Sequence, residues 1–397
     1  MDVKLVAKEF SPTEFVQFHV PQIDEDEIRS VVETLKSGWL TSGVKVKRFE
    51  EEFARYLGSR HAVAVNSCTA ALHLALEAIG IKEGDEVIVP TMTFTASAEV
   101  VLYLKAKPVL VDCLPDSLNL NADQLQRAIT SRTRAVMPVH FGGQPCEMAP
   151  ILEIARKHHL CVIEDAAHAL PAKYRDQMVG TIGDITCFSF YATKTITTGE
   201  GGMATTDNPE WAARMRMMSL HGISHDAWKR YAQEGSWYYE VLSPGFKYNL
   251  TDIAAAIGIE QLKKCNDFAA ARSNVAAAYT KAFSSMPEIR APVCAPENQH
   301  AWHLYVIQLQ LEQLKITRDQ FIEALKERGI GTSVHFIPLH LHPYYRDTFG
   351  YAPDDFPNAT EAYRRIVSLP IYPRMSDADI GRVIEAVRDV AQQHRNP

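Results

Sequence analysis

The sequence lacks the features that mark several large classes of protein. It has 41 lysines and arginines against 48 aspartates and glutamates, a net charge of −7, so there is no basic excess for binding a nucleic acid. Polar residues such as Asn66 and Glu77 interrupt its most apolar window, residues 61–80, which is a poor membrane span. No apolar stretch of a signal peptide follows Met1. We therefore expect a cytoplasmic protein without nucleic-acid or membrane partners.

The cysteines indicate neither a disulfide framework nor a zinc site. There are seven, an odd number, and no two form a Cys-x-x-Cys pair. His335, His340 and His342 come without a matching carboxylate or cysteine pattern, so no metal is predicted. Four cysteines lie in or beside apolar runs, as reduced buried thiols do: Cys113, Cys146, Cys161 and Cys187.

The composition is that of a globular protein, with 46% hydrophobic and 22% charged residues. The 397 residues are about two and a half times the length typical of one domain. Two domains of unequal size are therefore expected.

Between about residues 60 and 205, short β-branched runs alternate with helix-like segments such as residues 69–78. The runs are nearly continuous in apolar residues, which suits strands buried on both faces. This alternation predicts an α/β domain, a mostly parallel sheet with helices on both sides. The runs cover residues 61–65, 86–89, 108–111, 134–137, 160–163 and 185–190.

The chain after about residue 250 has a different pattern. We expect a smaller α+β domain joined to the first by a long helix. The predicted large domain, with an N-terminal arm, is residues 1–255, and the small one is residues 256–397. A long alanine-rich helix, a β-like run, a second helix and a last helix are expected at residues 251–282, 302–309, 318–328 and from about 376.

The carboxyl ends of parallel strands are where such sheets bind ligands, so the polar residues there are candidates. Residues 66–70 (NSCTA) follow the first run and open directly into a helix. Hydroxyl groups there either simply cap the helix or leave its backbone N–H groups for an anion. The sequence contains neither GxxxxGK nor GxGxxG, so neither a P-loop nor a dinucleotide fingerprint is predicted.

Two further strand ends carry charged residues. Glu164 and Asp165 follow the fifth run, where a buried carboxylate is costly without a cationic partner. They belong either to a structural salt bridge or to a site. Lys194 follows the sixth run between Thr193 and Thr195. A lysine so placed is either structural or a deprotonated amine nucleophile.

These three strand ends together match the needs of pyridoxal phosphate. That cofactor requires an anion site for its phosphate and a carboxylate that keeps its ring nitrogen protonated, so that the ring can act as an electron sink. It also requires a lysine that binds its aldehyde carbon. The helix start near Thr69, the carboxylate of Asp165 and the amine of Lys194 supply all three. The combination predicts a pyridoxal phosphate enzyme.

Three motifs identify a family: residues 164–168 (EDAAH), 189–194 (SFYATK) and 248–252 (YNLTD). With them the chain resembles the nucleotide-sugar aminotransferases of the DegT/StrS group, from residues 38–43 to residues 369–370. That group consists of pyridoxal phosphate enzymes of fold type I. The resemblance implies an aspartate aminotransferase-like fold with a mostly parallel seven-stranded sheet.

The resemblance also implies roles for individual residues. Lys194 would bind the aldehyde carbon of the cofactor, and Asp165 would pair with its ring nitrogen. Thr69 and Ala70 would hold the phosphate together with Ser189.

Two further side chains would contact the cofactor ring. Phe94 matches the aromatic that stacks on the ring, with a core aromatic as the alternative. His168 matches a position near the ring hydroxyl, with a loop histidine bonded to the backbone as the alternative.

The resemblance makes the active site a shared one. Asn249 matches an asparagine that reaches the cofactor phosphate of the neighbouring subunit, which implies a homodimer, although it could instead cap the following helix. Trp39, Thr41 and His335 would line the sugar-nucleotide cleft. A hydrophobic staple at Trp39 and an ordinary loop at His335 are the alternatives.

The implied reaction takes an amino group from L-glutamate to a keto-sugar linked to a nucleotide, with pyridoxamine 5′-phosphate as the intermediate form of the cofactor. We expect C4 of a UDP-4-keto-6-deoxy hexose, because residues 243–249 resemble the 4-aminating subgroup, and a role in cell-surface polysaccharide such as lipopolysaccharide O-antigen. A dTDP- or GDP-linked sugar aminated at C3 or C4 is the alternative.

Two other functions of such a fold are possible alternatives. A desulfurase would need a reactive cysteine, for which Cys68 is the candidate, and a regulatory relative would have lost catalysis.

Overall fold

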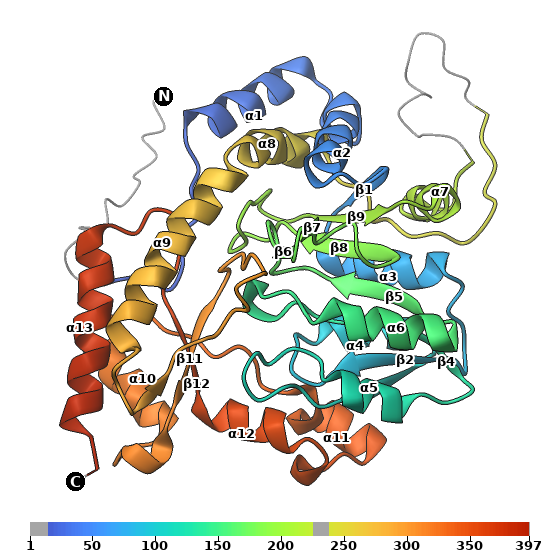
Figure 1. The fold of residues 1–397 in the computed structure, drawn as a ribbon. Helices are drawn as coiled ribbons and strands as arrows, with labels where there is room; N and C mark the ends of the chain where they lie inside the picture. Colours follow the sequence, from blue (N-terminus) through green and yellow to red (C-terminus); the bar gives the residue numbers. More distant parts are fainter. Residues whose placement is uncertain (1–14, 225–237, 397) are drawn as a thin grey trace.

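A seven-stranded sheet forms the centre of the larger part of the chain (Figure 1). The computed structural model describes residues 15–224 and 238–396. The strand order is β1-β9-β8-β5-β4-β2-β3, and all the strands run parallel except β9, which is antiparallel to both of its neighbours. The predicted mostly parallel sheet is therefore confirmed. The strands are β1 (His61–Val65), β2 (Glu86–Pro90), β3 (Lys107–Val111), β4 (Thr133–Val136), β5 (Cys161–Asp165), β8 (Ile185–Ser189) and β9 (Gly202–Thr206).

Within this seven-stranded sheet, β9 is the strand that the sequence did not predict. Its residues, Gly-Met-Ala-Thr-Thr, form no β-branched apolar run. The hydroxyl groups of Thr205 and Thr206 are nevertheless buried, because they donate hydrogen bonds to the carbonyls of Gly180 and Asp184 at 3.1 and 2.7 Å. Hydrogen bonds that form only after folding thus allow polar residues in a central strand.

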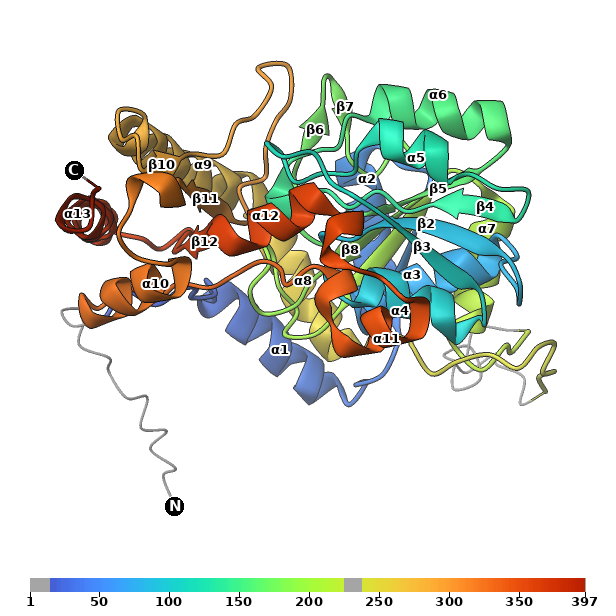
Figure 2. The same ribbon diagram turned by 90° about the horizontal axis from the view of Figure 1, so that it is seen from below.

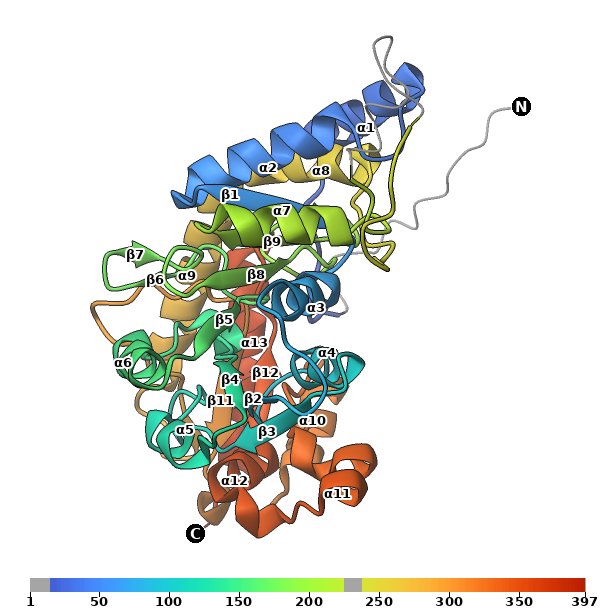
Figure 3. The same ribbon diagram turned by 90° about the vertical axis from the view of Figure 1, so that its right-hand side faces the viewer.

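Helices cover both faces of this sheet (Figure 3). Along β1, Val63 and Val65 belong to the apolar cluster that includes α3 and α4, whereas Ala62 and Ala64 belong to the cluster that includes α2. This alternation explains the continuous apolar runs, since both faces of each strand are buried. The covering helices are α2 (Val44–Leu57), α3 (Cys68–Ala78), α4 (Ala96–Tyr103), α5 (Ala122–Ala128), α6 (Met148–His158) and α7 (Pro209–Met218).

A second, antiparallel sheet of three strands forms the smaller α+β part of the chain (Figure 2). Its apolar cluster also includes Val16, which forms a bridge to Ile330, so the first described residues pack against the C-terminal part. Its strands are β10 (Ile289–Arg290), β11 (Tyr305–Leu309) and β12 (Ile366–Leu369), and its helices are α9 (Cys265–Phe283), α10 (Arg318–Glu327) and α13 (Asp377–Gln393).

The prediction of one long helix over residues 251–282 is wrong in one respect, because the chain turns at Lys264. It forms α8 (Asp252–Lys263) and then α9. The Nζ atom of Lys264 donates to Asp24 and Glu27 at 2.6 and 2.9 Å and thereby ties the turn to the start of α1 (Glu25–Ser37). Helix α8 packs on α1 and α2, and α9 packs on α13. The predicted boundary at residue 255 falls within α8 and stays a prediction.

A segment after α10 returns to the large sheet. The backbone N–H of Leu339 donates to the carbonyl of Thr91 at 2.9 Å, and that of Ala359 donates to Asp112 at 2.9 Å. This return brings His335 to the carboxyl ends of the large sheet. Its helices are α11 (Pro343–Phe349) and α12 (Pro357–Arg365), and β6 (Lys173–Tyr174) and β7 (Gln177–Met178) form a separate hairpin. Within residues 15–224 and 238–396, no helix combines the length and apolar character of a membrane span.

Candidate active site

The carboxyl ends of the large sheet open onto a cavity of about 410 Å³. Its walls come from the first turn of α3, from the ends of β5 and β8, and from two segments in the C-terminal half of the chain. The predicted strand-end residues therefore meet in one place, although their individual roles stay predictions. The predicted site residues that line this cavity are Thr69, Phe94, Asp165, His168, Ser189, Lys194 and His335.

Asp165, the last residue of β5, is buried in the wall of this cavity. Ser97 Oγ donates to its Oδ2 atom at 2.8 Å, and the backbone N–H of Ala167 donates to its Oδ1 atom at 3.1 Å. Burial raises the pKa of this carboxyl, while the two hydrogen bonds and the charge of Lys194 oppose the rise. Because neither hydrogen bond brings a cation, the carboxylate can still accept a proton or pair with a protonated nitrogen.

The neighbouring Glu164 is satisfied inside the protein. Its Oε1 atom accepts from Thr186 Oγ1 at 2.7 Å, and its Oε2 atom lies 2.9 Å from His140 Nε2. The backbone N–H of Cys146 donates to His140 Nδ1 at 3.0 Å, so the histidine proton is on Nε2 and points to the carboxylate. Glu164 therefore has a structural role in the protein interior. Of these two neighbouring carboxylates, Asp165 is the one that faces the cavity.

Lys194 lies in the turn that follows β8. Its backbone N–H donates to the carbonyl of Tyr191 at 2.9 Å, and its side chain reaches the cavity. Burial lowers the pKa of its amine from 10.5 to about 8, with a smaller decrease from Arg272 and an opposing effect of Asp165. A lowered pKa increases the neutral, nucleophilic fraction of the amine near physiological pH.

The first turn of α3 is capped by Ser67 and faces the cavity. Ser67 Oγ accepts the backbone N–H of Ala70 at 3.1 Å, while Ser67, Cys68 and Thr69 line the cavity. At Gly202 a Cβ atom would come within 2.5 to 2.6 Å of the backbone of Ser67 and Cys68, so only glycine lets β9 begin here. The capping and anion-site interpretations are compatible, because the first turn of a helix has several N–H groups without intrahelical partners.

Three histidines form one side of the cavity: His168, His303 and His335. The rings of His168 and His303 lie 4.4 Å apart between centroids. The backbone N–H of Gly142 donates to His168 Nδ1 at 3.3 Å, which leaves Nε2 as the protonated nitrogen. Burial lowers the pKa of all three, to about 4 for His335. They are therefore neutral at pH 7 and serve as hydrogen-bonding groups.

Phe94 is 59% exposed, so it is not a core aromatic. It lines the cavity, and its ring centroid lies 6.0 Å from that of Phe336. The position suits stacking on a bound ring, which stays a prediction.

Trp39, Thr41 and Asn249 lie outside this cavity and gather around Ser42. Asn249 Nδ2 donates to Ser42 Oγ at 2.7 Å, and Trp39 Nε1 donates to the carbonyl of Ser42 at 3.1 Å. The carbonyl of Thr41 accepts the N–H of Asp252 at 3.1 Å. Within one copy of the chain, the structure does not bring these three residues to Lys194.

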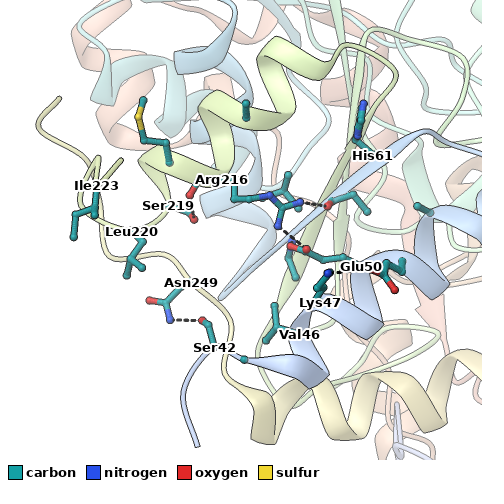
Figure 4. Close-up of a pocket in the computed structure, with 18 of the residues that line it drawn as sticks. Ser42, Val46, Lys47, Glu50, His61, Arg216, Ser219, Leu220, Ile223 and Asn249 are labelled. Atoms are coloured by element: carbon teal, nitrogen blue, oxygen red, sulfur yellow. Dashed lines mark hydrogen bonds and ion pairs between the residues drawn. The ribbon is translucent and has the colours of Figure 1, made fainter. Parts of the chain in front are cut away.

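Ser42 and Asn249 instead line a second cavity, of about 520 Å³ (Figure 4). In Figure 4 Asn249 points to Ser42, and Arg216 lies across the cavity in an ion pair with Glu50 at 2.6 Å. Asn249 is not the cap of α8, since Thr251 Oγ1 accepts the N–H of Ala254 in that role.

The sequence motifs did not indicate His303 and Phe336, which line the first cavity, or Ser97, which donates a hydrogen bond to Asp165 in its wall. Ser97 is the second residue of α4 and carries no recognisable signal. His303 lies within the predicted β-like run, but β11 begins only at Tyr305, which leaves His303 in the preceding loop. A histidine inside an apolar run was the available clue to His303.

Among the residues with described positions, no group of three His, Cys, Asp or Glu side chains could hold a metal ion.

Comparisons with known proteins agree with this geometry. A family model described as the DegT/DnrJ/EryC1/StrS aminotransferase family matches residues 21–388. Uncharacterized protein MJ1066 of Methanocaldococcus jannaschii is 54% identical over 375 residues, which are 94% of this chain and 97% of that protein. Spore coat polysaccharide biosynthesis protein SpsC of Bacillus subtilis is 52% identical over 379 residues, which are 95% of this chain and 97% of that protein.

A solved structure is similar over a comparable length. The putative sugar aminotransferase Spr1654 of Streptococcus pneumoniae, in its PMP form, matches with a TM-score of 0.90 and 32% identity over 95% of this chain and 99% of that chain. Its PLP form matches with a TM-score of 0.89.

Proposed function

Because the chain belongs to the DegT/DnrJ/EryC1/StrS aminotransferase family, we propose that it transfers the amino group of L-glutamate to a nucleotide-linked keto-sugar. The proposed acceptor position is C4 of a UDP-4-keto-6-deoxy hexose. The observation that carries the proposal is the meeting of the α3 N-terminus, Asp165 and Lys194 at one cavity. The protein is an aminotransferase of amino-sugar synthesis, in agreement with its family and with the putative sugar aminotransferase that it resembles in structure.

Pyridoxal phosphate fits this cavity. The first turn of α3, with Thr69 and Ser189, would hold the phosphate, and the buried carboxylate of Asp165 would pair with the ring nitrogen. The amine of Lys194 would bind the aldehyde carbon, and His168 Nε2 would donate to the ring hydroxyl. Spr1654, a sugar aminotransferase of similar structure, is known in both PLP and PMP forms. When bound, the cofactor supplies an electron sink for the carbon that loses a proton.

The side chains of this chain then perform the proton transfers. Once the amino donor has taken its place on the cofactor, the freed Lys194 Nζ would accept the Cα proton of the donor as a neutral amine and would hold it for return. Asp165 would keep the ring nitrogen protonated, since two hydrogen bonds hold its buried carboxylate in place in the cavity wall. The neutral histidines add no competing positive charge at pH 7.

Cys68 does not fit the alternative desulfurase chemistry. It lines the cavity, but burial raises the pKa of its thiol well above the usual range. A desulfurase needs a thiolate, which this environment disfavours.

A homodimer would complete the site. Asn249 lies outside the cavity of its own chain, and apolar side chains are exposed near it. Val241 and Leu242, close to it in sequence, are 63% and 60% exposed, and Val44, two residues after its partner Ser42, is 70% exposed. Exposed apolar groups of this kind favour a protein partner. We therefore propose that Asn249 reaches the phosphate held by a second copy of the chain.

The acceptor is tested with UDP-, dTDP- and GDP-linked 4-keto-6-deoxy sugars, each supplied with L-glutamate. We expect formation of 2-oxoglutarate and an amino sugar with the UDP compound, with the amine at C4 by NMR. Preference for dTDP or GDP, or an amine at C3, would revise the acceptor alone. Absence of transfer to every sugar would contradict the proposed function.

A further inference from the structure

A cluster of three side chains lies near Lys194: the buried Arg272 and His303, and the half-buried His19. We call it the donor cluster. Within residues 15–224 and 238–396, seven buried side-chain nitrogen or oxygen atoms have no hydrogen-bond partner, and four of them belong to this cluster. Buried polar atoms normally have partners, so this concentration at one place indicates a ligand. The four atoms are His19 Nε2, His303 Nδ1, and the Nε and Nη2 atoms of Arg272.

The members of the donor cluster are close to one another and to the cavity. Arg272 Nη1 donates to the carbonyl of His303 at 3.3 Å, and the His303 ring lines the cavity beside His168. Burial lowers the pKa of His19 to about 3, and Arg272 and Lys194 add to that decrease. A hydrogen bond of His19 to the backbone of Ala192, two residues before Lys194, opposes this decrease and places the ring beside the turn that carries Lys194.

Arg272 has two distinct sides. It is fully buried on α9, and its Nη1 atom donates to the carbonyls of Trp302, His303 and Ile371 at 3.3, 3.3 and 2.8 Å. In the described part of the chain, no carboxylate pairs with it. The Nε–Nη2 edge is the fork with which arginine binds a carboxylate through two hydrogen bonds. A buried cation without a counter-ion is costly unless a ligand supplies the negative charge.

The amino donor carries such a charge at the required place. In an amino acid, the carboxylate and the reacting amine are attached to the same carbon, so a carboxylate must come close to Lys194. The cavity lining contains no arginine and no lysine other than Lys194. The charge of Arg272 also lowers the pKa of the Lys194 amine, as expected of a guanidinium behind this part of the cavity.

We propose that His19, Arg272 and His303 form the subsite that binds a carboxylate of the amino donor. This inference rests on the proposed function and adds the location of donor recognition to it. The two histidines supply hydrogen bonds as neutral rings, and Arg272 supplies the charge, since its lowered pKa of about 10 still leaves it protonated at pH 7.

The test is the binding of glutarate, a dicarboxylate without an amine, to the cofactor-loaded protein by titration calorimetry. His19→Phe and His303→Phe keep an aromatic ring and remove its nitrogen atoms. We expect each to weaken glutarate binding at least tenfold, and Arg272→Lys to do the same. The matched control is Arg318→Lys, a buried arginine that contacts the backbone carbonyl of Ile366, and it should change binding less than twofold.

Because Arg272→Lys could unfold the protein, the two histidine variants decide the outcome, with thermal unfolding measured for each. The inference is overturned if both histidine variants bind glutarate as the unaltered protein does, or if the unaltered protein does not bind it. A second readout separates binding from structure. His19→Phe, whose side chain is not part of the cavity lining, should slow the half-reaction with L-glutamate and change the half-reaction of the aminated protein with keto-sugar less than twofold, whereas structural damage would slow both.

These experiments distinguish failure of the proposed function from failure of the proposed carboxylate subsite. If glutarate binding depends on the cluster but no keto-sugar is aminated, the proposed function is wrong and the subsite stands. If keto-sugars are aminated and the histidine variants leave glutarate binding unchanged, the subsite is wrong and the function stands.

Discussion

Ser97 Oγ donates a 2.8 Å hydrogen bond to Oδ2 of Asp165, and both residues are buried. Ser97 is on α4 and Asp165 ends β5, so the bond joins a covering helix to a sheet strand at the cavity wall. Thr93 Oγ1 lies 2.7 Å from Ser97 Oγ and continues the network. The carboxylate is thereby oriented before any ligand binds, as electrostatic catalysis requires.

Ser97→Ala should weaken cofactor binding. The substitution leaves one buried carboxylate oxygen without its donor, a loss of about 1.5–3 kcal/mol for a hydrogen bond to a charged group. It should also raise the pKa of Asp165 further, because the hydrogen bond from Ser97 opposes the rise caused by burial. Titration of cofactor-free protein with pyridoxal phosphate should give an affinity at least tenfold lower. Ser219→Ala, which removes a hydrogen bond of 2.8 Å from another buried serine, should bind the cofactor normally.

The amine of Lys194 should react at an unusually low pH. Since burial lowers its pKa to about 8, its modification by an amine reagent in cofactor-free protein should be half-maximal near pH 8. A midpoint above pH 10 for Lys194 would contradict the lowered pKa.

The lowered pKa of Lys194 should also make the free energy of unfolding depend on pH. Between about pH 8 and 10.5 the unfolded chain binds more protons at this lysine than the folded chain does. The free energy of unfolding should therefore rise with pH across that window. Lys194→Met should reduce this rise in denaturant titrations of cofactor-free protein, whereas a rise of unchanged size would show that other groups cause it.

Mixing two inactive variants should restore activity if the site is shared. Lys194→Ala should lower turnover at least about a hundredfold, since it removes the group that moves the proton. Asn249→Ala should weaken cofactor binding in the opposite subunit. A mixed dimer has one site with both residues intact, so co-refolded equimolar variants should recover about a quarter of normal activity. No recovery, with mixed dimers shown to form, would place Asn249 and Lys194 of the same copy in one site.

Gly202→Ala should destabilise the cofactor site. Its Cβ atom would lie 2.5 Å from the backbone carbonyl of Ser67 and 2.6 Å from the N atom of Cys68, and backbone atoms cannot rotate away. We expect a loss of about 1–3 kcal/mol in the free energy of unfolding, together with weaker phosphate binding. Gly381→Ala, at a helical glycine of α13 where a Cβ atom meets nothing within 4 Å, should instead stabilise the protein by about 0.5–1 kcal/mol. Equal effects of the two substitutions would contradict the close approach at Gly202.

The parts of the fold that could be predicted were those with a local signal. The apolar runs of β1, β2, β3, β4, β5 and β8 were visible because both faces of these strands are buried. Strand β9 was missed because its buried threonines are satisfied by hydrogen bonds to Gly180 and Asp184, more than twenty residues away in the chain. The break at Lys264 was missed because its ion pairs with Asp24 and Glu27 are also distant in sequence.

The sequence by itself determined which chemical groups stand at the strand ends, the hydroxyls near Thr69, the carboxylate of Asp165 and the amine of Lys194. It also determined that they meet, because the carboxyl ends of parallel strands share one edge of a sheet. Only the tertiary structure decided which residues from elsewhere complete the cavity. The packing of α4 brings Ser97 to Asp165, and a loop brings His303 to the cavity. Such contacts follow from the shape of the whole core rather than from the local sequence.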